Sequence, residues 1–330
     1  MRVGVVGLGL LGGSVARRLA VRHDVVGYDA DEQTRRAAAA AGLTLVGSVE
    51  EAGVGADVAI VATPLAAVAT VLPALSTSDC RVVTDVVSVK RPVLAAALAA
   101  GLAGRYIGGH PMAGTEHSGF AASDPALLDG AAWVLCLEHD TPIESWLAVA
   151  ELLTSAGSPV VPCSAAAHDD AQARVSGLPH VLAEALATVG GGGGPLAAVL
   201  AAGSFRDGTR VAGTRPELVA ALCDGNPEAL ADVLDEALAA LGEARTALAE
   251  GRSVLPLVTA GHAAHREFTR PLASVAERLD AAASTIRADL LALGAAGGVV
   301  DGVDGTVMHC RRPVTGRLVS PQPRTGKSPP

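Results

Sequence analysis

Residues 2–14 read RVGVVGLGLLGGS, and this stretch decides the fold of the N-terminal half. The apolar run at 2–6 predicts a β-strand, residues 10–21 have helical character, and residues 24–28 (DVVGY) return to a strand pattern. Between the first strand and the helix lies GLGLLG, which fits the pattern G-x-G-x-x-G. The sequence therefore predicts a βαβ unit with a glycine-rich turn.

The three glycines of this turn, at positions 7, 9 and 12, have separate roles in a dinucleotide-binding unit. The first permits a tight turn, the second lets a pyrophosphate approach the backbone, and the third lets the helix pack on the sheet. Asp29 follows the second strand, 22 residues after Gly7, where a carboxylate accepts hydrogen bonds from ribose hydroxyls and repels a 2′-phosphate. We therefore expect NAD as the cofactor. The alternative is a structural turn with Asp29 as an ordinary loop acid.

The alternation of strand and helix patterns continues to residue 163. Further strand candidates are LTLVG (43–47), DVAIVAT (57–63), RVVTDV (81–86), RYIGG (105–109), AAWVLCL (131–137) and SPVVPC (158–163). Such alternation predicts an α/β domain at 1–163 with a Rossmann-type, doubly wound and mostly parallel sheet.

Strand patterns disappear after residue 164. An apolar stripe between Leu230 and Leu248 and a second one between Phe268 and Leu293 predict long helices. We therefore expect an all-helical domain at 164–296, whose stripes serve bundle packing or a subunit interface. The glycine run at 190–194 predicts a flexible break, and the composition from residue 297 onward predicts a disordered tail at 297–330.

The composition excludes several classes of function. The net charge of −9, without a basic stripe, disfavours nucleic acid and anionic membrane as partners, and no apolar run reaches the roughly 18 residues of a spanning helix. Five cysteines without a CxxC pair argue against a disulfide framework or zinc site, and the histidines lack metal-ligand spacing. We expect a cytoplasmic protein with a small-molecule partner and no metal.

The segment GGHPMAGTEHSGF at 108–120 closely resembles the signature of the prephenate dehydrogenase family. Five other segments match family motifs in the expected order: GLGLLGGS (7–14), DVAIVATP (57–64), DVVSVK (85–90), HDDAQARVSGLPH (168–180) and GSFRDGTRVAG (203–213). The resemblance covers roughly residues 1–290. It implies NAD-dependent oxidative decarboxylation of prephenate to 4-hydroxyphenylpyruvate, by a homodimer joined through its helical domain.

The resemblance also assigns roles to individual residues. It implies that His110 accepts the hydrogen bond or proton of the substrate's C4 hydroxyl, that Ser88 hydrogen-bonds near His110 and the nicotinamide, and that Arg210 holds the departing carboxylate. Further substrate-site residues implied are His180, His168, Thr115, Glu116 and Asp207, of which Glu116 and Asp207 would orient Arg210 or gate entry. The implied cofactor contacts are Gly7, Leu8, Gly9, Leu10, Leu11, Gly12, Asp29, Thr63 and Pro64.

Three other functions compete with this interpretation. An arogenate (cyclohexadienyl) dehydrogenase would share the fold and every residue identified above. A β-hydroxyacid dehydrogenase of the 6-phosphogluconate type relies on a lysine in its helical domain, whereas Lys327 is the only lysine after residue 164. A non-catalytic NAD-binding regulatory dimer would leave His110 structural. Two positions depart from the family pattern: Val219 replaces a common tryptophan and Val87 a usual glycine.

Overall fold

The computed structural model describes residues 1–115, 117–270 and 272–318. The N-terminal part is built on a parallel sheet whose strand order is β3-β2-β1-β4-β5-β6. Its strands are β1 (Arg2–Val6), β2 (Asp24–Tyr28), β3 (Thr44–Leu45), β4 (Val58–Val61), β5 (Val82–Asp85) and β6 (Tyr106–Ile107). Its helices are α1 (Leu10–Leu19), α2 (Glu32–Ala40), α3 (Val49–Gly53), α4 (Leu65–Ser76) and α5 (Arg91–Ala99). The predicted doubly wound sheet is confirmed.

The strand order places a crevice at the carboxyl ends of β1 and β4. The chain moves outward from β1 to β2 and β3, and then returns to the other side of β1 to form β4, so the winding direction reverses between these two strands. Ligands of open α/β sheets bind at such a reversal. The sequence VAIV of β4 is buried at every position, as a strand covered on both faces requires.

A second sheet has the order β10-β12-β11-β9-β8-β7. Its strands are β7 (Gly109–Pro111), β8 (Trp133–Cys136), β9 (Val160–Cys163), β10 (Leu272–Asp280), β11 (Val299–Asp304) and β12 (Val307–Leu318). Strands β8 and β9 are parallel and the other pairs are antiparallel. The helices α6 (Ile143–Ser155) and α14 (Ile286–Ala295) pack on this sheet, and the short 3-10 turns η1 (Phe120–Ala122) and η2 (Pro125–Leu128) lie between β7 and β8.

The C-terminal strands overturn two expectations. The helix predicted between Phe268 and Leu293 is wrong over Leu272–Asp280, which form β10, and the disordered tail predicted from residue 297 is wrong over the segments that form β11 and β12. Met308 and Cys310 alternate with exposed residues along β12 and are buried. Residues 319–330 lie outside the described part of the chain.

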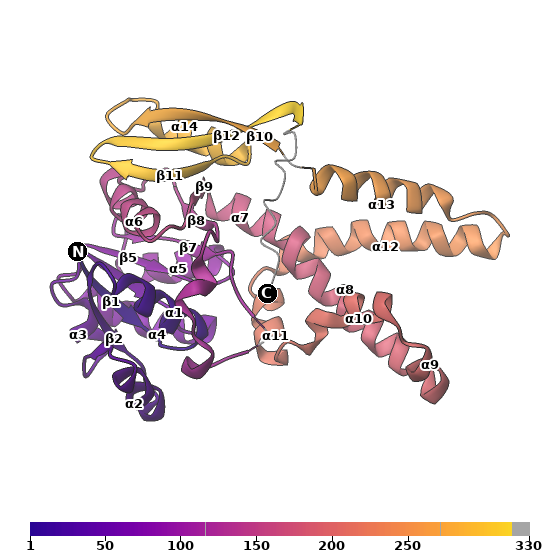
Figure 1. The fold of residues 1–330 in the computed structure, drawn as a ribbon, viewed down its shortest axis with the longest axis horizontal. Coiled ribbons are helices and arrows are strands. Elements are labelled where there is room, and N and C mark those ends of the chain that lie inside the picture. The colour runs from indigo at the N-terminus through magenta and orange to yellow at the C-terminus, as the bar shows by residue number, and fades with distance from the viewer. Residues whose placement is uncertain (116, 271, 319–330) are drawn as a thin grey trace, which may run out of the picture.

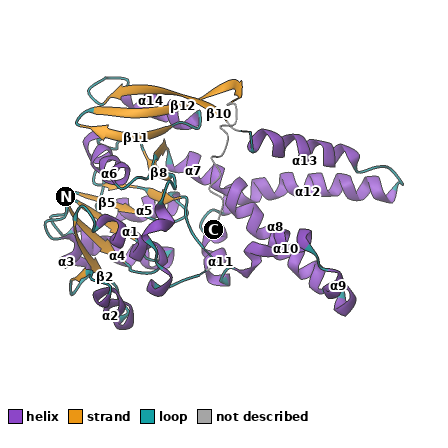
Figure 2. Cartoon of the chain, viewed as in Figure 1, coloured by secondary structure: helices purple, strands orange, loops and turns teal. Residues whose placement is uncertain are grey.

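The helical part begins with a nearly continuous helix. Its first segments are α7 (Ala165–Gln172), a π-helical stretch η3 (Ala173–Gly177) and α8 (Leu178–Gly191). It continues with α9 (Gly194–Leu200), α10 (Gly203–Thr209), a 3-10 turn η4 (Arg210–Gly213), α11 (Pro216–Asp224), α12 (Pro227–Ala249) and α13 (Leu255–Phe268). Helices α12 and α13 follow one another along the chain and project away from both sheets (Figure 1). Figure 2 shows that this projecting part is helical.

The break predicted at the glycine run is wrong in part. Helix α8 continues through Gly190 and Gly191, and α9 begins at Gly194. A Cβ at Gly190 would lie 2.3 Å from the ring of Phe205 on α10, so glycine serves close packing between two helices there. Within the described residues, no helix combines the length and apolar character needed to cross a bilayer.

Candidate active site

The glycine-rich turn after β1 has the geometry of a phosphate-binding loop. Gly7 has a φ of +92°, and a Cβ at Gly12 would lie 1.9 Å from the Gly7 carbonyl oxygen, so both positions require glycine for the fold. A Cβ at Gly9 would meet nothing within 4 Å. The backbone at Gly9 therefore faces open space, which is what the approach of a pyrophosphate requires.

Two unsatisfied polar features face the same edge of the sheet. Gly9 is the N-cap of α1 and provides no side-chain cap, so the first N–H groups of α1 remain available to an anion. The hydroxyl oxygen of Thr63, just after β4, is buried and has no hydrogen-bond partner among the residues that the structure describes. Pro64 is the N-cap of α4 directly after it. These residues fit a bound dinucleotide, which would provide hydrogen-bond partners for the first N–H groups of α1 and for the Thr63 hydroxyl.

Asp29 lies at the end of β2 and holds the turn with one carboxylate oxygen. Its Oδ2 accepts a hydrogen bond of 2.7 Å from the backbone N–H of Leu8, and its Oδ1 accepts one of 2.9 Å from Asp31. Each carboxylate oxygen has a second lone pair. The side chain can therefore also accept hydrogen bonds from ribose hydroxyls.

His110 lies on β7 at the edge of the second sheet and contacts a second histidine. Its Nδ1 is 2.9 Å from Nε2 of His168 on α7, and the two rings meet edge to face at 73°. The Nδ1 of His168 is in turn 2.7 Å from Oδ1 of Asp169. The structure thus joins two residues that lie 58 positions apart into one chain of hydrogen bonds that ends on a carboxylate.

Asp169 is an ionised acceptor. Burial acts to raise its pKa, but the hydrogen bonds from His168, Arg91 and Lys90 outweigh burial, so the pKa lies below its usual range. The backbone N–H groups of Lys90 and Arg91 donate to its two oxygens at 2.7 and 2.8 Å. The carbonyl oxygen of Asp169 accepts a hydrogen bond from the buried Asn226, which starts α12.

The ionised carboxylate assigns the tautomers of both histidines. Because Asp169 only accepts, Nδ1 of His168 carries a proton, and in the tautomer without a second proton its Nε2 is an acceptor. His110 then donates through Nδ1, which leaves the lone pair on its own Nε2. Burial, followed by the charge of Lys90 and by His168, holds the pKa of His110 well below its ordinary range, so the ring is neutral near pH 7.

The free nitrogen of His110 is available to a ligand. Among the described residues, Nε2 of His110 has no hydrogen-bond partner, and the ring is only partly buried. A neutral imidazole with an accessible lone pair can accept a proton from a hydroxyl. The site can therefore perform general-base chemistry.

A buried ion pair lies behind His110. Lys90 and Asp85 are both fully buried, and the ammonium donates to Oδ1 of Asp85 and, at 2.6 Å, to the carbonyl oxygen of Gly109. Asp85 also accepts hydrogen bonds from Gly109 N–H at 3.1 Å and from the Tyr106 hydroxyl at 2.5 Å. Burial, and next the charge of Asp85, raise the pKa of Tyr106 well above its usual range.

His180 and Arg210 form a second group of predicted site residues. His180 lies on α8 and Arg210 starts η4, which packs on α8. Burial lowers the pKa of His180, Glu184 opposes this shift, and the charge of Arg210 adds to it. Nδ1 of His180 is buried and has no hydrogen-bond partner within the described part of the chain, whereas Arg210 and Asp207 are exposed.

The two groups lie at opposite ends of a helical path. His180 lies 12 positions after His168, which corresponds to about 18 Å along a helix axis. Within the described residues, no hydrogen bond or ion pair joins them.

The remaining predicted residues lie in two loops, one between β5 and α5 and one after β7. Ser88 is partly buried, and its side chain forms no hydrogen bond within residues 1–115, 117–270 and 272–318. Thr115 is exposed and accepts a hydrogen bond of 3.2 Å from His117 N–H. Glu116 lies outside the described residues.

Sequence reasoning missed the support of His110. The prediction that His168 lines the substrate site stays a prediction, and the structure adds its contact with His110. No role was predicted for Asp169, Lys90 and Asp85. The signal was present in the sequence, because these residues lie inside the segments DVVSVK and HDDAQARVSGLPH. Their pairing depends on the tertiary contact between α7 and the start of α5.

Comparison with protein families gives two adjacent matches. Residues 13–161 match the nucleotide-binding domain of prephenate dehydrogenase, and residues 164–255 match the dimerization domain of the same enzyme. The C-terminal strands therefore lie beyond both matched regions.

Two curated relatives carry related names. The prephenate dehydrogenase of Lactococcus lactis is 32% identical over 239 residues, which are 68% of this chain and 64% of that protein. This chain thus spans slightly less than two thirds of that relative. The cyclohexadienyl dehydrogenase of Zymomonas mobilis is 32% identical over 259 residues, which are 75% of this chain and 88% of that protein.

Solved structures give a consistent result. A crystal structure of a candidate prephenate dehydrogenase from Corynebacterium glutamicum has a TM-score of 0.84 and 36% identity, and covers 92% of this chain and 99% of its own. The Aquifex aeolicus prephenate dehydrogenase in complex with hydroxyphenyl propionate and NAD+ has a TM-score of 0.72 and 25% identity, with 81% and 98% covered. Together with the geometry of the site, these matches show that the chain belongs to the prephenate dehydrogenase family.

Proposed function

We propose that this protein catalyses the NAD-dependent oxidative decarboxylation of prephenate to 4-hydroxyphenylpyruvate. The observation that carries the proposal is the neutral His110, whose accessible Nε2 holds a lone pair. Asp85 ends β5 and binds the residue before His110, so the imidazole lies at the carboxyl edge of the sheet, where the glycine-rich turn also lies. When bound, the dinucleotide supplies the acceptor for a hydride.

The proposed reaction requires one proton acceptor, which is His110. His110 accepts the proton of the C4 hydroxyl while the hydrogen on C4 leaves with its electron pair, and C4 becomes a carbonyl carbon. The bond between the ring and its carboxylate then breaks, CO2 leaves, and the released electron pair makes the ring aromatic. The phenolate oxygen takes the proton back from His110.

The hydrogen bonds behind His110 support this role. When His110 is protonated it carries a positive charge, and the chain through His168 to the ionised Asp169 stabilises that charge. The same chain keeps Nε2 free of a proton before the reaction. Asp169 therefore selects the reactive tautomer in a way that an isolated histidine could not.

Arg210 and His180 are proposed to bind the acidic end of the substrate. Their proximity, indicated by the effect of Arg210 on the pKa of His180, supports one shared subsite. A guanidinium binds a carboxylate with two parallel hydrogen bonds. Asp207 and Glu116 are proposed to orient Arg210, while Ser88 and Thr115 are proposed to contact the nicotinamide and the substrate.

We also propose NAD as the preferred cofactor, a homodimer as the active form and the cytoplasm as the location. Asp29 supports NAD because its carboxylate repels a 2′-phosphate. The match to a dimerization domain supports the homodimer. The five cysteines are free thiols, which fits a reducing compartment.

Arogenate is the second candidate substrate, and the cyclohexadienyl dehydrogenase among the relatives supports it.

A substrate assay distinguishes the two candidates. Purified protein is mixed with NAD+ or NADP+ and with prephenate or arogenate, and formation of the reduced nicotinamide is followed by absorbance. Faster turnover of prephenate with NAD+ is the expected result. A strong preference for arogenate would replace the substrate in the proposal and leave the chemistry at His110 unchanged.

His110→Asn tests the catalytic role. We expect loss of turnover with nearly unchanged NAD+ affinity, because Asn cannot accept the proton. His139→Asn is the control, since His139 is exposed and pairs with its neighbour Asp140. Because the pKa of His110 lies well below the ordinary 6.5, we expect wild-type kcat/KM to hold its neutral-pH value below pH 6.5. Turnover by His110→Asn at the wild-type rate would contradict the assignment.

A further inference from the structure

We propose that Lys90 is a positioning residue for the reaction at His110, because its side chain fixes the strand of His110 and its backbone fixes the carboxylate that orients His168. This inference rests on the proposed function, since it concerns the same histidine. Lys90 does not contact the accessible nitrogen of His110. Its role is to hold both histidines at the right separation.

The side chain of Lys90 binds the residue that precedes His110. Its ammonium donates to the carbonyl oxygen of Gly109 at 2.6 Å, while Asp85, its ion-pair partner, accepts from the Gly109 N–H at 3.1 Å. Both polar backbone groups of Gly109 are therefore held by one ion pair. A Cβ at Gly109 would lie 2.4 Å from the Asp85 carbonyl oxygen, so the strand is also tightly enclosed.

The backbone of Lys90 binds the other end of the histidine pair. Its N–H donates to Oδ1 of Asp169 at 2.7 Å, and the same oxygen is 2.7 Å from Nδ1 of His168. One residue thus fixes β7 through its side chain and α7 through its main chain. A shift of Lys90 would change the 2.9 Å contact between the two rings.

A buried charge is a costly way to connect two elements, and this cost argues for a role beyond packing. A buried ion pair repays its desolvation only with good geometry, and an apolar pair of similar volume often stabilises a fold equally well. The positive charge of Lys90 contributes to holding the pKa of His110 low, after burial. An apolar replacement would fill the same space without that effect.

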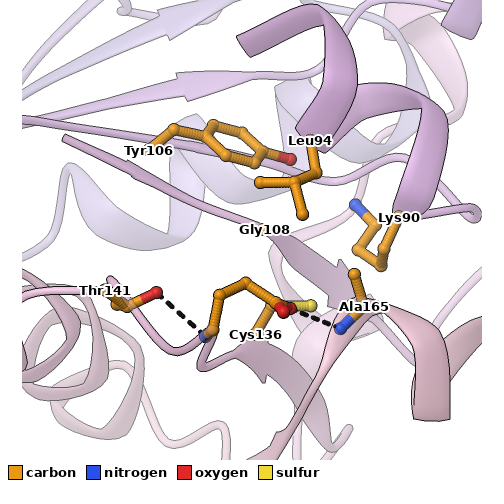
Figure 3. A pocket seen from close by; sticks show the side chains of 8 residues that line it. Lys90, Leu94, Tyr106, Gly108, Cys136, Thr141 and Ala165 are labelled. Atoms are coloured by element: carbon orange, nitrogen blue, oxygen red, sulfur yellow. Dashed lines mark hydrogen bonds between the residues drawn. The ribbon is translucent and has the colours of Figure 1, made fainter. Parts of the chain in front are cut away.

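The ion pair of Lys90 and Asp85 is buried in the protein interior. A small cavity beside it is lined by Leu94, Tyr106, Gly108 and Cys136, among others. Figure 3 shows the stem of Lys90 along this cavity and its ammonium turned toward the side where the Tyr106 hydroxyl lies. Charges interact more strongly across such a low-dielectric region than across water. The groups that face His110 from neighbouring elements are Lys90 and His168.

The test replaces both members of the ion pair, so that neither charge remains buried alone. In Asp85→Asn/Lys90→Met we expect kcat to fall by roughly 10- to 100-fold, the scale of a misplaced catalytic group, with little change in KM for NAD+. We also expect the acidic limb of kcat/KM to move to higher pH, because loss of the cation raises the pKa of His110. Lys90→Arg keeps the positive charge. In this variant the acidic limb of the kcat/KM pH profile should stay near its wild-type position while kcat falls.

A matched control and a second readout separate positioning from stability. Arg105→Met removes another cation, which binds the backbone carbonyls of Ser76 and Cys80 away from His110, and it should leave the limb in place. NMR titration of the His110 ring, assigned with His110→Asn, should give a higher pKa in the double variant whatever the substrate is.

Three results would overturn the proposal. The first is an unchanged pKa of His110 in the double variant, and the second is a fall of kcat in Arg105→Met as large as in the double variant. The third is a wild-type kcat in Lys90→Arg. If the double variant does not fold, the kcat of Lys90→Arg decides the test. Absence of turnover by the wild-type protein with every substrate and cofactor pair would instead refute the proposed function, and the NMR titration would still decide the role of Lys90.

Discussion

At the scale of single residues, the proposed chemistry depends on which nitrogen of His110 carries the proton. His110, His168 and Asp169 form a chain in which each hydrogen-bond direction determines the next. The acceptor at the end of the chain is a carboxylate, so the lone pair appears at the opposite end, on Nε2 of His110. A substitution of Asp169, which is separated from His110 by His168 in this series of hydrogen bonds, can therefore abolish proton transfer without contacting the substrate.

Asp169→Asn should reverse the tautomers. The amide of Asn can donate to Nδ1 of His168, which then donates through Nε2 to His110 and places the His110 proton on Nε2. We expect kcat to fall by about 10²- to 10⁴-fold, by analogy with the loss of the orienting carboxylate in a catalytic triad, with little change in NAD+ affinity. Asp170→Asn is the control, because Asp170 is exposed and pairs with Arg91. Equal kcat values for the two variants would refute the proton chain.

Asp29 should determine the choice of cofactor. Asp29→Asn keeps an acceptor for the Leu8 N–H but removes the negative charge that we propose faces the ribose. We expect kcat/KM for NAD+ to fall by about 10-fold or more, the scale of a charged hydrogen bond, and the preference for NAD+ over NADP+ to shrink. Asp31→Asn, which changes a helix cap two residues away, is the control. Steady-state kinetics with both cofactors gives the answer, and an unchanged preference would contradict the role of Asp29.

At the scale of elements, the glycine-rich turn separates folding from binding. Gly9→Ala should leave the melting temperature unchanged, because its Cβ would meet no protein atom within 4 Å, yet weaken NAD+ binding by occupying pyrophosphate space. Gly12→Ala should instead destabilise the protein by about 1–3 kcal/mol, because its Cβ would lie 1.9 Å from the Gly7 carbonyl oxygen. Thermal unfolding and fluorescence titration with NAD+ measure the two effects. Similar melting temperatures for both variants would contradict this separation.

The N-terminal strands could be predicted from the sequence because their hydrophobic pattern is compatible with only one kind of element. A buried run such as VAIV in β4, preceded by a glycine turn and followed by a helix start, fits only a central parallel strand. The segment of β10, LASVAERLD, spaces its apolar residues so that both a helix and a strand accommodate them. Its pairing with β12, a strand that lies 27 residues or more further along the chain, decided between them, and such long-range pairing is not visible in a local pattern.

The candidate site was predictable in its motifs and unpredictable in its contacts. The segment around His110 pointed to a catalytic histidine, whereas the partner of that histidine depends on how α7 packs beside the start of α5. Lys90 illustrates the same limit, because a lone lysine before a helix is ordinarily a solvated side chain. Only the fold shows that it is buried and bound on two sides.

At the scale of the whole molecule, the C-terminal strands belong to the N-terminal body. Leu290 and Leu293 of α14 are fully buried in the same core as residues of β1 and β8. The guanidinium of Arg287 donates to the carbonyl oxygens of Glu138 and Thr141, in the loop after β8. The chain therefore leaves the N-terminal body, builds the helical part, and returns to complete the second sheet (Figure 1).

The helical part, in contrast, leaves much of its apolar surface uncovered. On α12 the side chains of Leu238, Leu241 and Leu248 are 62%, 53% and 65% exposed. On α8, Leu186 and Val189 are exposed as well. A patch of this kind on an extended helical arm is typical of a subunit interface, in agreement with the match to a dimerization domain.

The paired substitution Leu238→Glu/Leu241→Glu should therefore convert the proposed dimer to a monomer. Each change places a charge where the partner subunit would bury a leucine, and burying an unpaired carboxylate costs far more than the association can repay. Sedimentation velocity at micromolar concentration should show a species of half the wild-type mass, with an unchanged circular dichroism spectrum. Val21→Glu is the matched control, because Val21 is 77% exposed on the N-terminal body, away from the arm, and should leave the dimer intact. If the double variant sediments with the wild-type mass, this face of α12 is not the interface, and the exposed face of α8 becomes the next surface to change.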